Sequence, residues 1–132
     1  MQNQRWITVL LAAVAAPAFA VDHPVHVGGS GLTFTPSSVD VLVGDTVTFI
    51  NDGGFHNAAS DPGAPISFHC SAGCGASPVG DPNGSAWTAT VTITAAAAHR
   101  TIGYHCDAHQ ASGMVGTINV TDPVELQSFR ID

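Results

Sequence analysis

The sequence predicts an all-β protein, a sandwich of about seven to eight short strands. Apolar and polar residues alternate with a period of two along much of the chain after residue 20, as in strands with one buried and one solvated face. Clusters of Gly, Pro and Asp separate these runs, and helical periodicity is almost absent. Strands of this length and spacing in about 110 residues are typical of two packed sheets.

The first half of the chain contains four candidate strands and one candidate hairpin. The strands are predicted at residues 25–27, 32–35, 39–43 and 47–51. In the third, alternate valines from Val39 to Val43 share one face, and in the fourth Val47 and Phe49 point inward. Gly44-Asp45 lies between these two runs and predicts a hairpin turn.

The second half contains three candidate strands. The clearest is WTATVTIT at residues 87–94, where apolar side chains from Trp87 to Ile93 alternate with four threonines. Residues 101–106 and 116–120 supply the others. The tail at residues 121–132 alternates weakly and predicts either a final strand or a frayed end.

A long segment between the two halves, from Asn51 to Ala86, is rich in Gly, Pro, Ser and Asp and predicts a loop. Loops of this length are functional or cross-linked more often than not. Cys70 and Cys74 lie within it, and in an exported protein we expect them to form a disulfide that leaves Cys106 unpaired. The alternatives are two free thiols, or a metal site that uses them with His69.

Residues 1–20 have the features of a secretory signal peptide. One positive charge at Arg5 precedes an apolar run at residues 6–16, and a small-x-small motif ends at Ala20. The apolar run is shorter than the roughly 20 residues that a membrane span needs. We therefore expect an exported, periplasmic protein without a membrane span, in which residues 21–132 form a single domain with its core at 25–120.

The charge of the mature chain restricts the class of partner. The whole chain has a formal charge of −7, and removal of Arg5 with the leader leaves two arginines against ten acids, so that 2 − 10 = −8. Such a chain repels phosphate, which argues against nucleic acid and anionic membrane as partners. A partner with a basic surface is favoured.

The stretch YHCDAHQASGMVG, residues 104–116, contains a candidate metal site. Cys106, His109 and Met114 offer a thiolate, an imidazole and a thioether, which are soft or borderline ligands. If Tyr104 enters the core, Cys106 points inward at the end of the same strand. His56, which follows the strand that ends near Asn51, is the candidate fourth ligand. Two histidines, one cysteine and a weak axial methionine make the blue-copper electron-transfer arrangement.

These motifs resemble the cupredoxins of the bacterial plastocyanin and pseudoazurin type. The resemblance extends from Val25 to Val120 and rests on F-x-P-x4-V at residues 34–41, GDTVTFIN at 44–51, HN at 56–57, C-x2-H-x4-M at 106–114 and the following VGTINV. It implies a Greek-key sandwich with one type 1 (blue) copper ion. By the same resemblance the copper ligands are His56, Cys106, His109 and Met114.

The resemblance also implies roles for residues around the copper ion. Asn57 is expected to brace the Cys106 loop with its polar groups. His109 is expected to lie nearest solvent and to pass the electron, within a flat, mostly uncharged patch formed by Phe55, Ala111, Ser112 and Gly113.

The sequence departs from that family in three places. Phe55 stands where plastocyanins often have a proline before the first histidine ligand, and His99-Arg100 replaces a Pro-Gly turn. The segment with Cys70 and Cys74 resembles an insertion of some bacterial members. These changes bear on potential and partner choice and leave the ligand set intact.

The remaining histidines are expected to be structural or solvated. His23 and His26 lie near the mature amino end, His69 in the long loop and His99 in a turn. His105 precedes the ligand cysteine, where copper oxidases and nitrite reductases have a ligand of a second copper centre, and its side chain is expected to face outward. An oxidase would also have histidine after the cysteine, where this chain has Asp107.

Taken together, the sequence predicts an exported one-electron carrier that is a monomer, is not an enzyme and meets redox proteins transiently. The alternative is a periplasmic copper-binding or delivery protein without a shuttle role. Delivery proteins usually expose several Met or His ligands, and this chain has two methionines, one of them Met1.

Overall fold

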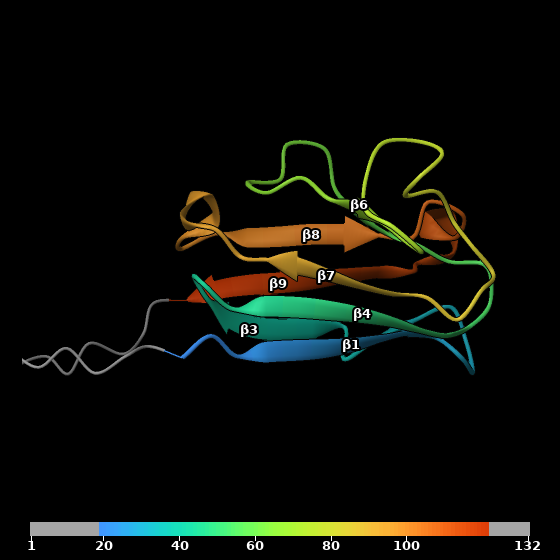
Figure 1. Ribbon diagram of the computed structural model, residues 1–132, viewed down its shortest axis with the longest axis horizontal. Coiled ribbons are helices and arrows are strands. Elements are labelled where there is room, and N and C mark those ends of the chain that lie inside the picture. The colour runs from blue at the N-terminus through green and yellow to red at the C-terminus, as the bar shows by residue number, and fades with distance from the viewer. Residues whose placement is uncertain (1–18, 122–132) are drawn as a thin grey trace, which may run out of the picture.

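The computed structural model describes residues 19–121, which form two β-sheets packed face to face (Figure 1). Nine strands and two single-turn 3-10 helices, η1 (Ala95–Ala97) and η2 (Gln110–Ser112), make up this part of the chain. The predicted β-sandwich is confirmed. Most of the predicted signal peptide and the tail beyond Thr121 lie outside the described residues, so both stay predictions. No helix within residues 19–121 is long and apolar enough to cross a bilayer.

The first sheet has the strand order β2-β1-β4-β7. Its strands are β1 (Asp22–Gly28), β2 (Phe34–Thr35), β4 (Thr46–Gly53) and β7 (Thr88–Thr92). β1 and β4 pair in parallel, whereas β7 pairs with β4 in the antiparallel sense. The parallel pair carries the ends of β1 and β4 to the same end of the sandwich, where the candidate site lies.

The second sheet has the strand order β3-β9-β8-β5-β6. Its strands are β3 (Ser38–Leu42), β9 (Val115–Thr121), β8 (Thr101–His105), β5 (Ala58–Ser60) and β6 (His69–Cys70). β8 and β9 are consecutive and antiparallel, so the loop between them returns the chain to the end of the sheet at which it left. That loop contains Cys106, His109 and Met114.

The predicted hairpin at Gly44-Asp45 is wrong. The turn exists, but β3 pairs with β9 and β4 pairs with β1 and β7, so the turn carries the chain from one sheet to the other. Val43 is 43% exposed and does not share the buried face of Val39 and Val41, because the strand ends before it. Alternation predicted the strands correctly but contains no information on which strands pair.

Asp45 holds this turn together from a buried position. Its carboxylate accepts the backbone N–H groups of Leu42 at 2.9 Å and Val21 at 3.0 Å, and it lies 2.9 Å from His23 Nε2. Burial acts to raise the pKa of Asp45, but the two N–H donors and His23 outweigh it, so the pKa is lowered. Because the pKa is lowered, the ionised carboxylate stabilises the fold at pH values above the pKa of Asp45 in the unfolded state. This stability is lost as the pH falls through the lower pKa of the folded state.

Replacing Asp45 by asparagine is therefore expected to destabilise the apoprotein by about 2 kcal/mol at pH 7, since hydrogen bonds to a charged acceptor are lost. The difference from wild type should shrink as the pH falls below about 4, the unfolded-state pKa, and through the lower pKa of the folded state, where the wild-type carboxylate becomes protonated. Urea unfolding of both apoproteins at pH 7 and near pH 3 measures this. An equal difference at both pH values would contradict the assigned role of the carboxylate.

The core between the sheets consists of the inward faces that the alternation predicted. Val47, Phe49 and Ile93 are fully buried, and Trp87 is 3% exposed. The ring of Tyr104 packs in the centre of an aromatic group, with centroids 4.8 Å from Phe34 and 5.2 Å from Phe49. Offset and edge-on contacts of this kind add about 1 kcal/mol each to the area that they bury.

The hydroxyl group of Tyr104 is fully buried and has no hydrogen-bond partner within residues 19–121. Burial raises the pKa of this phenol well above its usual value. Replacing Tyr104 by phenylalanine removes the unpaired polar group and keeps the ring, so we expect the free energy of unfolding to rise by about 1 kcal/mol. Denaturant unfolding of the apoprotein measures it, and a loss of stability of that size would show that the hydroxyl is satisfied in solution.

The segment from Asn51 to Ala86 contains more structure than the predicted loop. β4 continues to Gly53, and the short strands β5 and β6 extend the second sheet, with Ala59 opposite both His105 and His69. Alternation cannot be detected in strands of two or three residues, which is why the pattern missed them. The predicted Cys70–Cys74 disulfide is present, so neither free thiols nor a metal site at these two cysteines remains.

Candidate metal centre

Two segments that are far apart in the sequence meet at one end of the sandwich to form the candidate site. His56 follows β4, Cys106 follows β8, and His109 lies just before η2. One nitrogen from each histidine and Cys106 Sγ all lie within 4.8 Å of one another, which no other group of His, Cys, Asp or Glu among the described residues achieves. The sandwich thus brings together the three residues predicted as the strong ligands.

The ligand atoms face a common point. Cys106 Sγ lies 3.8 Å from His56 Nδ1 and 3.6 Å from His109 Nδ1, and the two Nδ1 atoms are 3.2 Å apart. His56 and Cys106 are buried, and His109 is partly exposed. A thiolate with two imidazoles in this arrangement suits copper in either oxidation state, since the sulfur favours Cu(I) and the imidazoles accept Cu(II).

Backbone hydrogen bonds return the β8–β9 loop to Cys106 and bring Met114 beside it. Cys106 N–H donates to Met114 O at 3.1 Å, and Met114 N–H donates to His109 O at 3.2 Å. His109 N–H in turn donates to Cys106 O at 3.1 Å. Met114 is fully buried, so the predicted methionine ligand lies in the interior, beside the other two predicted ligands of its loop.

His56 is held by backbone contacts and by two glycines. Its backbone pairs with Asn83, and Trp87 Nε1–H donates to His56 O at 3.2 Å. A Cβ atom on Gly28 would lie 2.5 Å from His56 Nε2, and one on Gly54 would overlap the same ring. Gly54 belongs to the Gly53-Gly54 pair that was expected to allow a sharp approach of His56, whereas the contact with Gly28 was not predicted.

The electrostatic surroundings keep the His56 imidazole neutral. Burial lowers the pKa of His56, and the neighbouring His109 lowers it further, although the Gly53 backbone acts in the opposite direction. A pKa below its usual value leaves the ring unprotonated at neutral pH. An unprotonated ring nitrogen is what a metal ligand requires.

Asn57 bridges the segment after His56 to the segment after Cys106. Its Nδ2–H groups donate to Asp107 Oδ2 at 2.7 Å and to Gly80 O at 3.0 Å, and Asp107 N–H donates to Asn57 Oδ1 at 2.8 Å. Asn57 is fully buried. These bonds have the geometry expected of a residue that braces the Cys106 loop.

A cluster of acids and histidines that the sequence analysis did not recognise surrounds Asp107. His105 faces away from the core, opposite to Tyr104 and Cys106 as expected, but its side chain is only 10% exposed and lies 2.6 Å from Asp61 and 3.0 Å from Asp107. His69 Nε2 lies 2.7 Å from Asp107 Oδ2. The cluster forms because β5 and β6 extend the sheet beside β8, and the missed short strands concealed this.

The charges in the cluster are mutually stabilised. Burial opposes the charged forms of both Asp107 and His69, but their hydrogen bonds outweigh it. The pKa of Asp107 is lowered by Asn57, His69 and His105, and the pKa of His69 is raised by Gly75 O and Asp107.

A separate cavity of about 560 Å³ lies between the disulfide segment and β7. Its lining includes Ile66, Phe68, Cys70, Cys74 and Thr90, and none of the four predicted ligands. The candidate metal site is therefore not this cavity.

The four residues predicted to form an uncharged patch around His109 are all exposed to solvent. Phe55 is 58% exposed, and Ala111, Ser112 and Gly113 are also exposed. Gly113 ends η2 with a φ of 86°, a left-handed conformation that glycine adopts without strain.

Comparison with known sequences gives a consistent result. A family model described as copper binding proteins, plastocyanin/azurin family, matches residues 21–121. Chloroplastic plastocyanin of Pisum sativum is 33% identical over 119 residues, with 86% of this chain and 66% of the pea protein covered, just under two thirds of its length. Chloroplastic plastocyanin of Chlamydomonas reinhardtii is 34% identical over 127 residues, with 89% of this chain and 82% of that protein covered.

Solved structures show the same fold. Pseudoazurin from Methylobacterium extorquens AM1 matches with a TM-score of 0.56 and 24% identity over 77% of this chain and 76% of that one. Oxidised plastocyanin from Dryopteris crassirhizoma matches with a TM-score of 0.55 and 23% identity over 74% of this chain and 98% of that one. The fold of this chain is thus cupredoxin-like.

Proposed function

Because the chain belongs to the plastocyanin/azurin family of copper-binding proteins, we propose that it is a one-electron carrier with a single type 1 copper ion as its cofactor. The observation that carries the proposal is the convergence of Cys106 Sγ and the Nδ1 atoms of His56 and His109. Copper bound there supplies a couple between Cu(I) and Cu(II). We assign the chain no enzymatic step.

In this proposal each residue of the site has a distinct task. His56, Cys106 and His109 would hold the copper ion through two imidazole nitrogens and a thiolate, and Met114 would offer its thioether as a weaker ligand. His56 and Cys106 come from the ends of strands in different sheets, so packing of the core fixes their separation. A site that cannot move keeps its geometry in both oxidation states, which favours fast electron transfer.

We propose that the electron enters and leaves through His109. It is the only one of the four proposed ligands that is partly exposed, and the patch of Phe55, Ala111, Ser112 and Gly113 carries no charge. A small, uncharged patch suits brief contact with a redox partner, because transient redox complexes have small interfaces.

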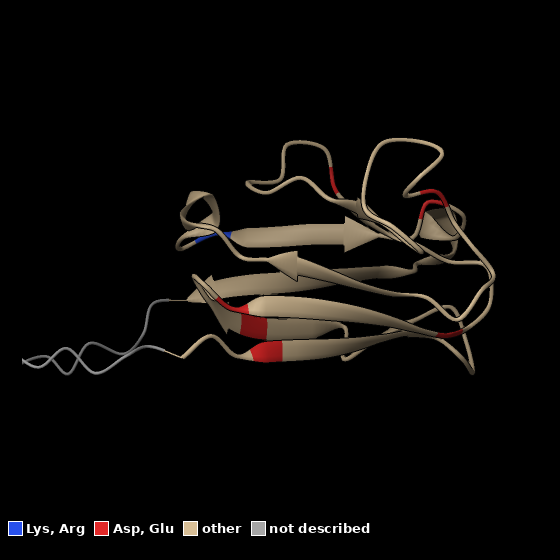
Figure 2. Cartoon of the chain, viewed as in Figure 1, with Lys and Arg blue, Asp and Glu red and all other residues tan. Residues whose placement is uncertain are grey.

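The charge distribution supports a partner with a basic surface. Arg100 is the only Lys or Arg within residues 19–121, and it lies before β8, at the opposite end of that strand from Cys106. Figure 2 shows acidic residues and no basic ones near the site end of the sandwich. Long-range attraction of this kind speeds the encounter of the two proteins and weakens as salt is added.

The proposed form of the protein is a monomer that residues 1–20 direct to the periplasm.

The experiment that tests this function is a visible absorption and electron paramagnetic resonance spectrum of the mature protein after one equivalent of Cu(II). An intense thiolate-to-copper band with narrow hyperfine splitting is expected. A pale solution with wide splitting would show that copper binds without Cys106 and would overturn the type 1 assignment.

A kinetic measurement separates electron transfer from copper delivery. A carrier exchanges electrons rapidly with small redox mediators and keeps its metal. Loss of copper to a competing apoprotein, combined with slow reduction, would favour the delivery function instead.

A further inference from the structure

The carboxylate of Asp107 has contacts on both of its oxygens. Oδ1 lies 3.0 Å from His105 Nε2, and Oδ2 lies 2.7 Å from both His69 Nε2 and Asn57 Nδ2. Asp107 directly follows Cys106, and its own N–H donates to Asn57 Oδ1 at 2.8 Å. Any displacement of this carboxylate is therefore transmitted to the backbone that carries the thiolate.

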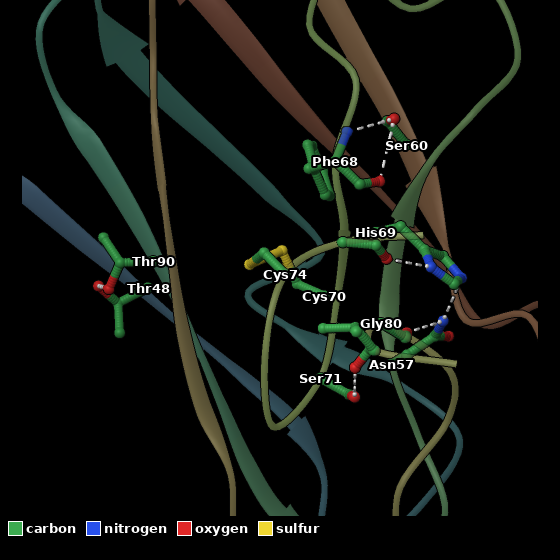
Figure 3. Close-up of a disulfide and its surroundings, with 12 residues drawn as sticks. Thr48, Asn57, Ser60, Phe68, His69, Cys70, Ser71, Cys74, Gly80 and Thr90 are labelled. Atoms are coloured by element: carbon green, nitrogen blue, oxygen red, sulfur yellow. Dashed lines mark hydrogen bonds between the residues drawn. A yellow bond between two sulfur atoms is a disulfide. The ribbon is translucent and has the colours of Figure 1, made fainter. Parts of the chain in front are cut away.

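His69 comes from a part of the chain that is distant in sequence from Asp107. It lies in β6, beside Ala59 of β5, and its Nδ1 lies 3.0 Å from Gly75 O, to which it donates. Both ring nitrogens are thus engaged, one with the segment after β6 and the other with Asp107. Figure 3 shows the ring of His69 directed toward Asn57 and away from the disulfide.

The Cys70–Cys74 disulfide fixes the segment that holds His69. It closes a short loop that begins immediately after His69, and Gly75 N–H donates back to His69 O at 2.9 Å. A Cβ atom on Gly80 would overlap His69 O and lie 2.5 Å from its Nδ1, so the segment packs directly against the histidine. Gly80 O also accepts from Asn57 (Figure 3).

We propose that His69 is a positioning residue of the copper centre, through which the disulfide-fastened segment at residues 69–80 holds Asp107 and the Cys106 backbone in place. This inference rests on the proposed function. The orientation of the thiolate and the hydrogen bonding around it set the potential of a blue-copper site. The predicted family roles involve Asn57 alone, whereas here a histidine and a disulfide from a distant segment complete the support.

Two substitutions of His69 separate the contact made by its Nε2 atom from the contact made by its Nδ1 atom. His69→Gln keeps an N–H group near the position of Nε2, which reaches Asp107, and loses the Nδ1 contact. His69→Asn keeps an N–H group near the position of Nδ1, which reaches Gly75 O, and loses the contact with Asp107. If His69 acts through Asp107, only His69→Asn changes the copper centre strongly.

A third variant controls for the loss of any histidine and acid pair. His23 lies 2.9 Å from Asp45, and its ring is 24% exposed against 28% for His69. It stands near the start of β1, whereas the other end of that strand contacts His56. His23→Asn is expected to reduce stability and to leave the copper centre unchanged.

The test compares the reduction potential and visible spectrum of copper-loaded wild type and the three variants. His69→Asn is expected to change the ratio of oxidised to reduced protein at a fixed potential by about tenfold, which is about 59 mV for a one-electron couple. It should also shift the thiolate-to-copper band. His69→Gln should stay near wild type. A Cys70→Ser, Cys74→Ser double variant should reproduce the effect of His69→Asn, and combining these substitutions with His69→Asn should not increase that effect.

A copper-free measurement keeps the inference testable by itself. Exchange of the Asp107 amide hydrogen in the apoprotein should be at least about tenfold faster in His69→Asn than in wild type and unchanged in His23→Asn. Unaltered exchange, potential and spectrum in a blue His69→Asn variant would overturn the positioning role alone. Absence of a blue band in wild type would overturn the proposed function, and no histidine variant would be needed to show it.

Discussion

Replacing Cys106 by alanine is expected to abolish the intense visible absorption of the Cu(II)-loaded protein. Cys106 is the unpaired cysteine of the described chain, is fully buried, and supplies the one thiolate within reach of His56 and His109. Without it no thiolate-to-copper transition exists, whatever the two histidines still bind. The apoprotein should lose only about 1 kcal/mol of stability, the usual cost of a single substitution.

Absorption and electron paramagnetic resonance spectra of the copper-loaded variant measure this loss, and unfolding of the apoprotein establishes that the variant is folded. Met114→Gln is the matched control on the same loop. It should keep both the copper and the blue colour and change the reduction potential, because it alters only the weak axial contact. A blue Cys106→Ala protein would show the assignment to be wrong.

Replacing Gly28 by alanine is expected to disrupt the site from β1, the neighbour of β4 in the first sheet. Gly28 has a φ of 68°, and a Cβ atom there would overlap Gly53 O and lie 2.5 Å from both Cδ2 and Nε2 of His56. Left-handed strain costs about 1 kcal/mol and overpacking about 1 to 3 kcal/mol more. Relief of the overlap requires movement of the His56 ring, so the blue spectrum should change or weaken together with the loss of stability.

Gly63→Ala is the control that separates backbone strain from the contact with His56. Gly63 also has a positive φ, 79°, but no atom lies within 4 Å of the position of its Cβ. It should lose only the strain energy of about 1 kcal/mol and keep an unchanged spectrum. Identical spectra for wild type and Gly28→Ala would show that the ring of His56 is not confined by this glycine.

The sequence predicted some features of the fold and not others. A turn at Gly44-Asp45 was predictable from the residue types, because both favour turns irrespective of context. The sheets that the turn joins were not predictable, since β3 and β4 each take their partners from strands elsewhere in the chain. Sequence patterns encode the local conformation, and pairing depends on contacts across the whole domain.

In the site, too, the ligand residues were predictable from the sequence, whereas the contacts around Asp107 were not. The order and spacing of His56, Cys106, His109 and Met114 suggested the ligand set because each lies beside a strong strand pattern or in a short loop between two such patterns. The group formed by Asp61, His69, His105 and Asp107 lacked such a signal. Its contacts depend on β5 and β6, whose three and two residues are too short to show alternation.

From the sequence alone follow the β class of this protein, most of the inward faces of its long strands and the chemistry of the residues at the strand ends; the pairing of Cys70 with Cys74 was expected, with two alternatives open. These features follow from side-chain periodicity, local turn preferences and ligand chemistry, all of which act over a few residues. Only the tertiary structure decided which strands are neighbours, that Gly28 confines His56, and that His69 reaches Asp107. Those contacts join residues 28 and 38 positions apart, and the order of the strands within each sheet, not local conformation, brings them together.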